Sequence, residues 1–160
     1  MIDLQQVGQG REGYALLAAQ LEALLAGERD FIANAAQFAA FLFSEVDGLN
    51  WAGFYLNRSE ELVLGPFQGK VACVRIPFGR GVCGAAASTR QTQRVEDVHA
   101  FPGHIACDSA SNSELVVPLV KAGRLIGVLD LDSPRLGRFS AEDQAGIERL
   151  AEIFLHLSDC

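Results

Sequence analysis

The chain has 160 residues, of which 49% are hydrophobic and 21% are charged, a composition typical of an ordered globular protein. A domain of this length buries roughly 70% of the surface of its unfolded chain, so a core forms without disulfide staples. Twenty acidic and thirteen basic residues give a net charge of −7, which argues against nucleic acid and anionic membranes as partners.

The N-terminus and the cysteines indicate a cytoplasmic protein. The opening sequence "MIDLQQVGQGREGY" lacks the basic segment and apolar stretch of a signal peptide, and no apolar run approaches the ~20 residues that span a bilayer. Cytoplasmic thiols stay reduced, and the four cysteines contain no CxxC pair with metal-binding spacing. We therefore expect reduced cysteines, each of which needs its own interpretation.

Residue spacing and end signals predict four helices. Apolar residues recur at helical spacing over Tyr14–Leu25, and Gly27 then ends the first helix. A second amphipathic helix starts at about Asp30 and is followed by the turn-forming "DGLN". A short helix starts near Val82 in "GRGVCGAAASTR", and the last begins at Ser140, where "SAED" is a capping-box pattern.

The middle of the chain predicts a sheet of about six strands. Short segments rich in branched and aromatic residues, bounded by turns, are "WAGFYLN", "ELVLGPF", "VACVRIPF", "ELVVPLV" and "RLIGVLDLD", with a sixth near "TQRVEDV". Helices at both ends favour an α+β fold, with an antiparallel sheet covered on one face by the terminal helices and on the other by irregular segments. Without repeats or linkers, we expect one domain over 1–160, with an N-terminal helix in 1–28 and a core over 29–157.

Three acidic residues are predicted to converge on one face of the sheet. The connection "KAG" fits a three-residue turn with glycine last, which pairs Val120 with Arg124 and places Glu114 opposite Asp130. Asp132 lies two residues further and shares that face. Because like charges across strands are destabilising, this cluster predicts a pocket for a small ligand with an ammonium group, such as an amino acid. Crowding would also raise the pKa of one acid, which could then act as a general acid.

A different turn would remove this pocket. A two-residue turn shifts the register by one residue and places Glu114 opposite Leu131, so that the acids become solvated strand ends. The aromatic residues are equally open to two interpretations. Trp51 and Tyr55 alternate on one face of "WAGFY", where Gly53 leaves room between them. They form either the walls for a flat or thioether-like group or part of the core.

The cysteines differ in their surroundings. Cys107 lies in the polar stretch "CDSASNSE", so its thiol is expected to be accessible, as reactive cysteines are. Cys83 lies near the start of the short helix, where the dipole would lower the pKa of its thiol, and Cys73 lies in a predicted strand. Any two of these could meet, and the alternative is that they are small core residues. Cys160 is assigned no role.

Two histidines near Cys107 suggest a zinc site with the cysteines, or a hydrolase with His104 as the base. The spacings between Cys73, Cys83, His104 and Cys107 match no zinc pattern, and no hydrolase signature surrounds a cysteine. We therefore expect His99 and His104 to lie in a solvated loop.

The chain resembles a GAF domain over nearly its whole length. The resemblance lies in the order of its segments: two helices, then "WAGFYL", "IPFGRGVCGAAASTRQTQRVEDV", "SELVVPLVKAGRLIGVLDLDS" and "FSAEDQAGIERLA". The motifs "GPFQGKVACVRIPFGRGVCG", "VEDVHAFPGHIACDSASNSELVVPL" and "GVLDLDS" resemble, more narrowly, the free methionine-R-sulfoxide reductases. This resemblance implies a single GAF-like domain with active-site loops on one face of the sheet. It implies reduction of the R epimer of free methionine sulfoxide, with thioredoxin as reductant and without a metal or organic cofactor.

The resemblance also assigns roles to residues. It places the nucleophile on Cys107 and the resolving cysteine on Cys73, with Cys83 as an auxiliary or alternative resolving cysteine. The matching substrate-binding residues are Trp51, Tyr55, Glu114, Asp130 and Asp132. A homodimer through the terminal helices is expected by analogy with other GAF domains. The alternatives are a GAF sensor that binds a small molecule without turnover and a thiol-based redox sensor.

Overall fold

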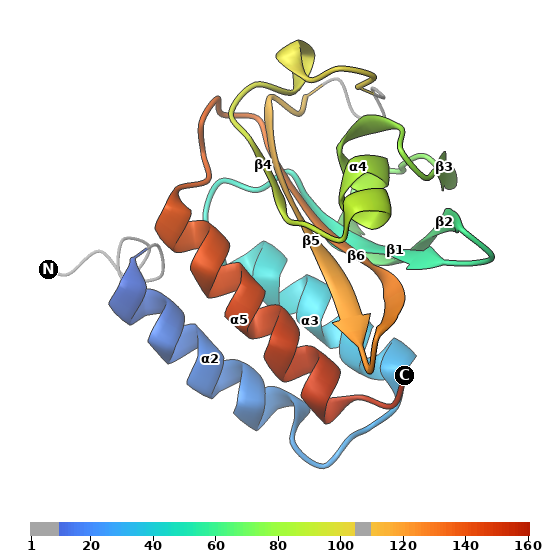
Figure 1. Ribbon diagram of the computed structural model, residues 1–160. Coiled ribbons are helices and arrows are strands. Elements are labelled where there is room, and N and C mark those ends of the chain that lie inside the picture. The colour runs from blue at the N-terminus through green and yellow to red at the C-terminus, as the bar shows by residue number, and fades with distance from the viewer. Residues whose placement is uncertain (1–9, 105–109) are drawn as a thin grey trace, which may run out of the picture.

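The computed structural model describes residues 10–104 and 110–160 (Figure 1). Its helices are α2 (Arg11–Leu25), α3 (Phe31–Glu45), α4 (Gly81–Thr89) and α5 (Ala141–Leu157), with a 3₁₀ turn η1 (Val98–Ala100). Its strands are β1 (Trp51–Asn57), β2 (Glu61–Gly69), β3 (Arg75–Pro77), β4 (Gln93–Val95), β5 (Ser113–Lys121) and β6 (Arg124–Ser133). Within these ranges no helix has both the length and the apolar character needed to cross a membrane.

The strands form one antiparallel sheet with the order β3-β2-β1-β6-β5-β4. Helices α2, α3 and α5 lie on one side of it and α4 on the other (Figure 1). The predicted α+β architecture, with terminal helices on one face and irregular segments on the other, is therefore confirmed.

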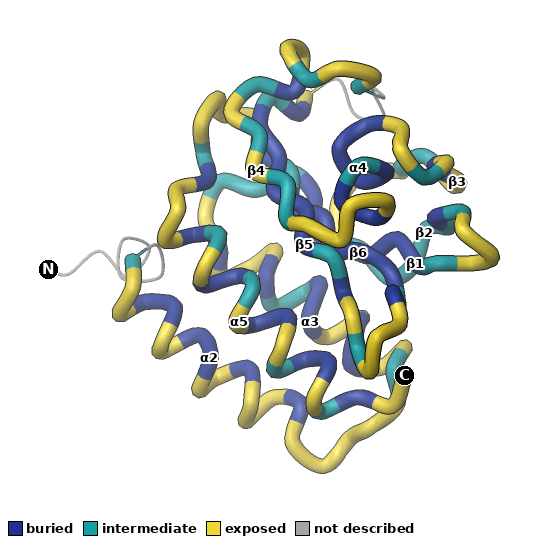
Figure 2. Tube along the Cα trace, in the orientation of Figure 1, coloured by how far each residue is buried: buried dark blue, intermediate teal, exposed yellow. Residues whose placement is uncertain are grey.

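The face under the terminal helices holds the larger apolar core. Alternate strand residues such as Phe54 and Leu129 point into it and are fully buried. The rings of Phe38, Phe54 and Phe154 lie 5.2–6.0 Å apart, centroid to centroid, and join α3 and α5 to β1. Figure 2 shows the buried side of each of these helices turned towards the sheet. This aromatic contact fixes the helical layer on the sheet.

The predicted helix ends are confirmed in detail. Asp30 caps α3 by accepting a hydrogen bond from the backbone N–H of Ala33. Ser140 and Asp143 form the reciprocal capping box of α5. Gly27 has a φ of +86°, a conformation that glycine adopts without steric cost, and it follows the end of α2. Local signals therefore position the helices that frame the sheet.

The opposite face carries a second apolar cluster, made from the other set of alternate residues and from α4. Val116 and Val128 contribute to it from β5 and β6, and Val82 and Ala86 contribute from α4. Because α4 covers only part of this face, polar strand residues beside it border a cavity.

The hairpin between β5 and β6 differs from the predicted one. Lys121 pairs with Arg124, so the loop is the two-residue Ala122-Gly123, and the predicted pairing of Val120 with Arg124 is wrong. Both loop residues have positive φ, +52° and +76°, as a type I′ turn requires. This turn matches the right-handed twist of the strands, which explains why it replaces the three-residue turn.

A bulge beyond the turn corrects the register. The pairing shifts between Leu119 and Val120, which pair with Gly127 and Leu125, so Ile126 is the extra residue. Glu114 therefore lies opposite Asp132, and neither the predicted partner Asp130 nor the alternative Leu131 is correct.

The predicted strand "VACVRIPF" is shorter than expected. Only Arg75–Pro77 pairs with β2, so Cys73 lies in the connection between β2 and β3 and not in a strand. Val71 and Val74 are 88% and 61% exposed, so these two valines, which suggested a strand, have no layer to pack against. Cys73 is therefore held by a loop.

Candidate active site

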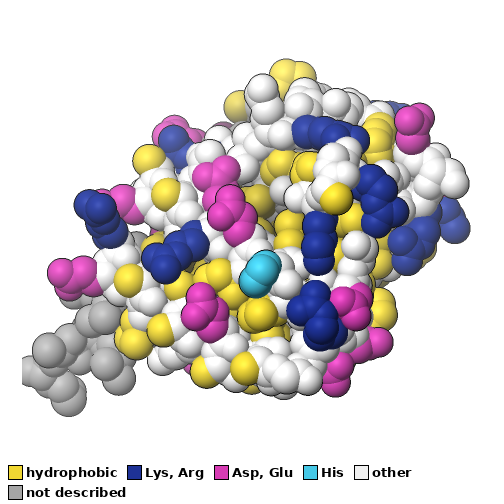
Figure 3. All heavy atoms as spheres, turned by 60° about the horizontal axis from the view of Figure 1, so that its bottom comes forward, with side chains coloured by type: hydrophobic (Ala, Val, Ile, Leu, Met, Phe, Trp, Pro, Cys, Tyr) yellow, Lys and Arg dark blue, Asp and Glu magenta, His cyan; other side chains and the backbone are white. Residues whose placement is uncertain are grey.

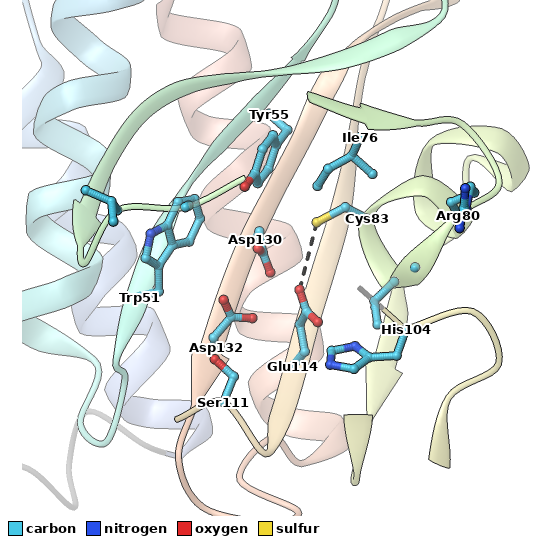
Figure 4. Close-up of a pocket in the computed structure, with 14 residues that line it drawn as sticks. Trp51, Tyr55, Ile76, Arg80, Cys83, His104, Ser111, Glu114, Asp130 and Asp132 are labelled. Atoms are coloured by element: carbon cyan, nitrogen blue, oxygen red, sulfur yellow. Dashed lines mark hydrogen bonds between the residues drawn. The ribbon is translucent and has the colours of Figure 1, made fainter. Parts of the chain in front are cut away.

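A pocket lies on the α4 side of the sheet, over β1, β5 and β6 (Figure 4). Among its lining residues are all those predicted for substrate binding: Trp51, Tyr55, Glu114, Asp130 and Asp132. Cys83, from the first turn of α4, also lines it. The structure thus brings together residues that are up to 81 positions apart (51 to 132).

The register arranges the acids in two adjacent rows. Trp51, Asp132 and Glu114 lie side by side across β1, β6 and β5. Asp130 lies in the next row, between Gly53 and Val116. Because Asp130 and Asp132 are two residues apart, their side chains emerge on the same face. The two-residue turn that was expected to dissolve the cluster does not do so, because the bulge restores the shared face.

Burial controls the protonation of these acids. Glu114 and Asp130 are only 8% and 4% exposed. Burial raises the pKa of both carboxyl groups well above the usual value; the negative charge of Asp130 raises that of Glu114 further, and the charge of Asp132 does the same for Asp130. The crowded acids therefore tend to hold protons, as the sequence suggested, and a protonated carboxyl group is available as a general acid.

Cys83 does not have the activated thiol that its helix position suggested. Its Sγ donates a hydrogen bond to Oε2 of Glu114 over 3.8 Å. Burial raises the pKa of this thiol, and the nearby charges of Asp130 and Glu114 raise it further. The prediction of a lowered pKa is wrong, because the helix dipole acts weakly beside desolvation and facing carboxylates.

The two aromatic residues whose role the sequence left open line the pocket and are also part of a core. Trp51 and Tyr55 stack at 5.8 Å between ring centroids and line the pocket, yet both belong to the second apolar cluster. The room above Gly53 is taken by Phe67, which stacks on Trp51 at 5.2 Å. The Tyr55 hydroxyl donates to the Cys73 carbonyl over 2.9 Å. One wall of the pocket therefore also holds the segment that carries Cys73.

The cysteines are in different states. Cys73 is disulfide-bonded, whereas Cys83 and Cys160 are free thiols, the latter exposed at the C-terminus. The expectation of four reduced cysteines is therefore wrong for Cys73. Cys107, the predicted nucleophile, lies outside the described residues.

The histidines follow the expectation in part. His99 is exposed in η1, and its Nε2 lies 3.0 Å from Oδ1 of Asn112. His104 is partly buried and lines the pocket, and burial lowers the pKa of its imidazole. Among residues 10–104 and 110–160, neither histidine joins a group of side chains with metal-ligand spacing.

Two polar residues that the sequence did not mark as site residues, Ser111 and Arg80, also line the pocket. Ser111 is buried, and its hydroxyl accepts a hydrogen bond from Nδ2 of Asn50 over 3.1 Å. Arg80 lines the pocket from the residue before α4. The place of Ser111 in the polar segment that leads into β5 could have indicated that it lines the pocket. Nothing in the sequence indicates this for Arg80, because its position depends on how α4 packs on the sheet.

This arrangement, an antiparallel sheet with helices on one face and a small-molecule pocket on the other, is that of a GAF domain. The GAF domain family profile matches residues 19–154.

The free methionine-R-sulfoxide reductase of Escherichia coli is 58% identical over 87% of this chain and 84% of its own. The crystal structure of free methionine-R-sulfoxide reductase from Neisseria meningitidis in complex with its substrate is 49% identical, with a TM-score of 0.88 over 92% of this chain and 89% of its own. The yeast Saccharomyces cerevisiae has a free methionine-R-sulfoxide reductase that is 44% identical over 82% of this chain and 78% of its own. The chain belongs to the free methionine-R-sulfoxide reductase family, a family of oxidoreductases.

Proposed function

We propose that this protein reduces free methionine-R-sulfoxide to methionine. The observation that carries the proposal is a cluster of acids, buried Glu114 and Asp130 with half-buried Asp132. The cluster faces one pocket beside the Trp51 and Tyr55 rings. Relatives with 58% and 44% identity over most of the chain carry the name of this reductase.

The acids explain selection of a free amino acid. An α-ammonium group supplies the positive charge that buried carboxylates need, whereas a methionine inside a peptide has no such group. A peptide would leave the carboxylates of Glu114 and Asp130 desolvated without a cation. The Trp51 and Tyr55 rings offer the flat apolar surfaces on which a methyl-sulfur group packs.

The reduction itself needs a thiolate and a proton. We propose that the Cys107 thiolate attacks the sulfoxide sulfur while a protonated acid of the cluster gives its proton to the sulfoxide oxygen. The attack forms a bond between the Cys107 and substrate sulfur atoms, and the substrate's sulfur–oxygen bond breaks as the hydroxyl group passes to Cys107. The sulfur–sulfur bond then breaks with its electron pair on the substrate sulfur, which leaves as methionine. Cys107 loses two electrons and becomes a sulfenic acid that carries the former sulfoxide oxygen.

A disulfide completes the cycle. Cys73 attacks the sulfenic acid of Cys107, water leaves, and thioredoxin then reduces the resulting disulfide by thiol exchange. The bonded state of Cys73, with Cys83 and Cys160 both free, supports Cys73 as the resolving residue and leaves Cys83 as the auxiliary one. No metal or organic cofactor takes part in this cycle.

The test incubates the protein with each sulfoxide epimer and either dithiothreitol or thioredoxin with its reductase, and measures free methionine. We expect methionine from the R epimer alone, and none with a Cys107→Ser variant. Equal turnover of methionine sulfoxide inside a peptide would disprove the role of the acids. A sensor would bind the compound without consuming it, and a redox sensor would form its disulfide with peroxide alone.

We also propose a cytoplasmic homodimer. Leu16 and Leu24 of α2 are 52% and 42% exposed. In the proposed dimer, these apolar side chains pack against the second copy of the chain. Figure 3 shows hydrophobic side chains interspersed with charged ones on the helical side, which suits a modest interface. Light scattering after size exclusion should give twice the chain mass of 17.2 kDa; a value near 17.2 kDa would rule the dimer out.

A further inference from the structure

Three potential metal ligands converge in the pocket from three elements. Cys83 of α4, Glu114 of β5 and Asp130 of β6 each offer one ligand atom, and these atoms lie within 4.8 Å of one another. All three residues are buried, and Figure 4 shows their side chains directed towards a common point. The Cys83 Sγ and Glu114 Oε2 atoms are 3.8 Å apart.

A second observation concerns one carboxylate oxygen of this triad. Oδ1 of Asp130 is buried and accepts no hydrogen bond from the part of the chain that the structure describes. Buried carboxylate oxygens are normally paired, because they lose their hydration without compensation. Among the described residues, this oxygen therefore marks a place that suits a cation or a hydrogen-bond donor.

We propose that this triad binds a zinc ion, which occupies the place of the substrate's ammonium group and inhibits the reductase reversibly. The part of the proposal that concerns inhibition rests on the proposed function. The ion is held by the Cys83 thiolate and one oxygen each of Glu114 and Asp130, with water in the fourth position. On binding, the Cys83 thiol and each protonated carboxyl group of Glu114 and Asp130 lose their protons to solvent.

The distances suit zinc. A tetrahedral ion with bonds of about 2.3 Å to sulfur and 2.0 Å to oxygen holds those two ligand atoms about 3.5 Å apart. The 3.8 Å between Cys83 Sγ and Glu114 Oε2 therefore needs only a small contraction. The cavity has a free volume of ≈ 40 Å³, which admits about three water-sized groups and so accommodates an ion with its water.

The donor set also selects the class of ion. One thiolate beside two carboxylates suits a borderline ion such as Zn²⁺, whereas Mg²⁺ and Ca²⁺ prefer oxygen ligands alone and Cu⁺ prefers sulfur. A divalent ion neutralises more of the negative charge of Cys83, Glu114 and Asp130 than one ammonium group does. Zinc and substrate therefore compete for the same carboxylates.

The first test uses Co²⁺ as a spectroscopic substitute for zinc. It is titrated into the disulfide-bonded protein, in which Cys73 is blocked and Cys83 and Cys160 are free thiols. We expect a sulfur-to-cobalt charge-transfer band that Zn²⁺ abolishes, retained in Cys160→Ser and absent in Cys83→Ser. A band that survives Cys83→Ser, or the lack of any band in the parent protein, would overturn the site.

Zinc affinity is then measured by competition with a chromophoric chelator. Cys83→Ser and Asp130→Asn should each weaken binding at least about 10-fold, since loss of a partner that only orients a ligand already weakens binding by that much. Near-ultraviolet circular dichroism verifies that each variant is folded. If a variant does not fold, the parent protein decides the matter: methionine should weaken zinc binding in proportion to its concentration, and independent binding would disprove a shared site.

Inhibition is measured in a single turnover, without added thiol, because dithiothreitol binds zinc. Pre-reduced protein is mixed with methionine-R-sulfoxide, with and without Zn²⁺, and methionine is measured. Zinc should slow the reaction, and excess substrate should restore the rate; a rate indifferent to zinc would contradict the inhibition. The cobalt band needs no turnover, so failure of the reductase assay leaves the metal site standing, and loss of the band leaves the reductase standing.

Discussion

The face of the sheet under α3 and α5 and the face under α4 are made from alternate residues of the same strands. On β1, Phe54 points to the first face, and Trp51 and Tyr55 point to the second. On β6, Leu129 and Leu131 belong to the first, and Asp130 and Asp132 line the pocket on the second. Strands β1, β5 and β6 thus contribute to both faces, yet only one of the faces is uniformly apolar.

This difference separates stability from recognition. The apolar face gains free energy from burial and close packing. The pocket face buries acids that repel one another, which lowers the stability of the folded state until a cation arrives. Alternate residues of the same strands therefore form the stabilising core on one face and the destabilising acidic pocket on the other. The substitutions below test whether the two faces are separable.

The largest effect is expected on activity at the pocket face. Asp130→Asn should lower kcat/KM by about 30-fold to several thousand-fold, the equivalent of 2–5 kcal/mol for loss of one partner of a buried charge pair. Its free energy of unfolding should equal or exceed that of the parent, because the repulsion with Glu114 is relieved. Turnover assays and urea unfolding measure the two quantities. Asp159→Asn, on an exposed carboxylate that pairs with Arg29, is the control. It should leave kcat/KM unchanged and alter the free energy of unfolding by less than about 1 kcal/mol.

The reverse pattern is expected for the helical face. Phe54→Ala removes a fully buried ring that packs against Phe38 and Phe154, and should lower the free energy of unfolding by about 3–5 kcal/mol. Urea unfolding gives the value. Ile32→Ala, on the exposed side of α3, should change it by less than about 1 kcal/mol. A loss at Phe54 no greater than that at Ile32 would refute the assignment of this core.

Tyr14 tests the outer helix of the same layer. Its hydroxyl donates to Oδ1 of the buried Asp143 over 2.7 Å, which ties α2 to α5. Tyr14→Phe should lower the free energy of unfolding by about 1–3 kcal/mol, since it leaves a buried charged oxygen with one partner fewer. Because Tyr14 is remote from the pocket, thermal unfolding should change while the KM for the sulfoxide does not. A changed KM would argue against separable faces.

The pH dependence of stability should differ between the parent and a Glu114→Gln/Asp130→Asn variant. Burial raises the pKa of both acids in the folded state, so the fold holds protons that the unfolded chain releases above about pH 4. Stability supplied by these protons is complete below that pH and is lost as the pH rises through the folded pKa values. As the pH rises, the free energy of unfolding of the variant should therefore increase relative to that of the parent. The increase is up to about 1.4 kcal/mol per pH unit for each acid. Urea unfolding from about pH 5 to pH 8 would show parallel curves if this is wrong.

The smallest effect is expected at Tyr55. Tyr55→Phe removes the hydrogen bond to the Cys73 carbonyl and should lower the free energy of unfolding by about 0.5–1.5 kcal/mol. Disulfide formation after one turnover should also slow, because the loop that carries Cys73 loses a contact. Rapid quenching with an alkylating agent follows that step. An unchanged rate would mean that this hydrogen bond supports the wall of the pocket alone.

Features that depend on periodicity and on neighbouring residues could be predicted from the sequence. Features that depend on contacts between elements distant in the chain could not. The capping box at Ser140 and the shared face of Asp130 and Asp132 follow from neighbouring residues and are confirmed. The pKa of Cys83 was predicted in the wrong direction, because the carboxylates that oppose the helix dipole come from other strands. Cys73 was placed in a strand because its valine neighbours suggested one, although no layer covers them.

The bulge at Ile126 has one more consequence. Side chains alternate between the two faces of a sheet. One extra residue between two paired positions therefore changes which side chains share a face, whether that residue lies in the turn or in a bulge. The bulge supplies the count that the two-residue turn lacks. The tip at Ala122-Gly123 lies about 26 Å from Glu114 along an extended strand, beyond the bulge. Insertions at this tip that leave Lys121 paired with Arg124 keep the register at the pocket, which makes the tip a suitable place to insert a reporter peptide.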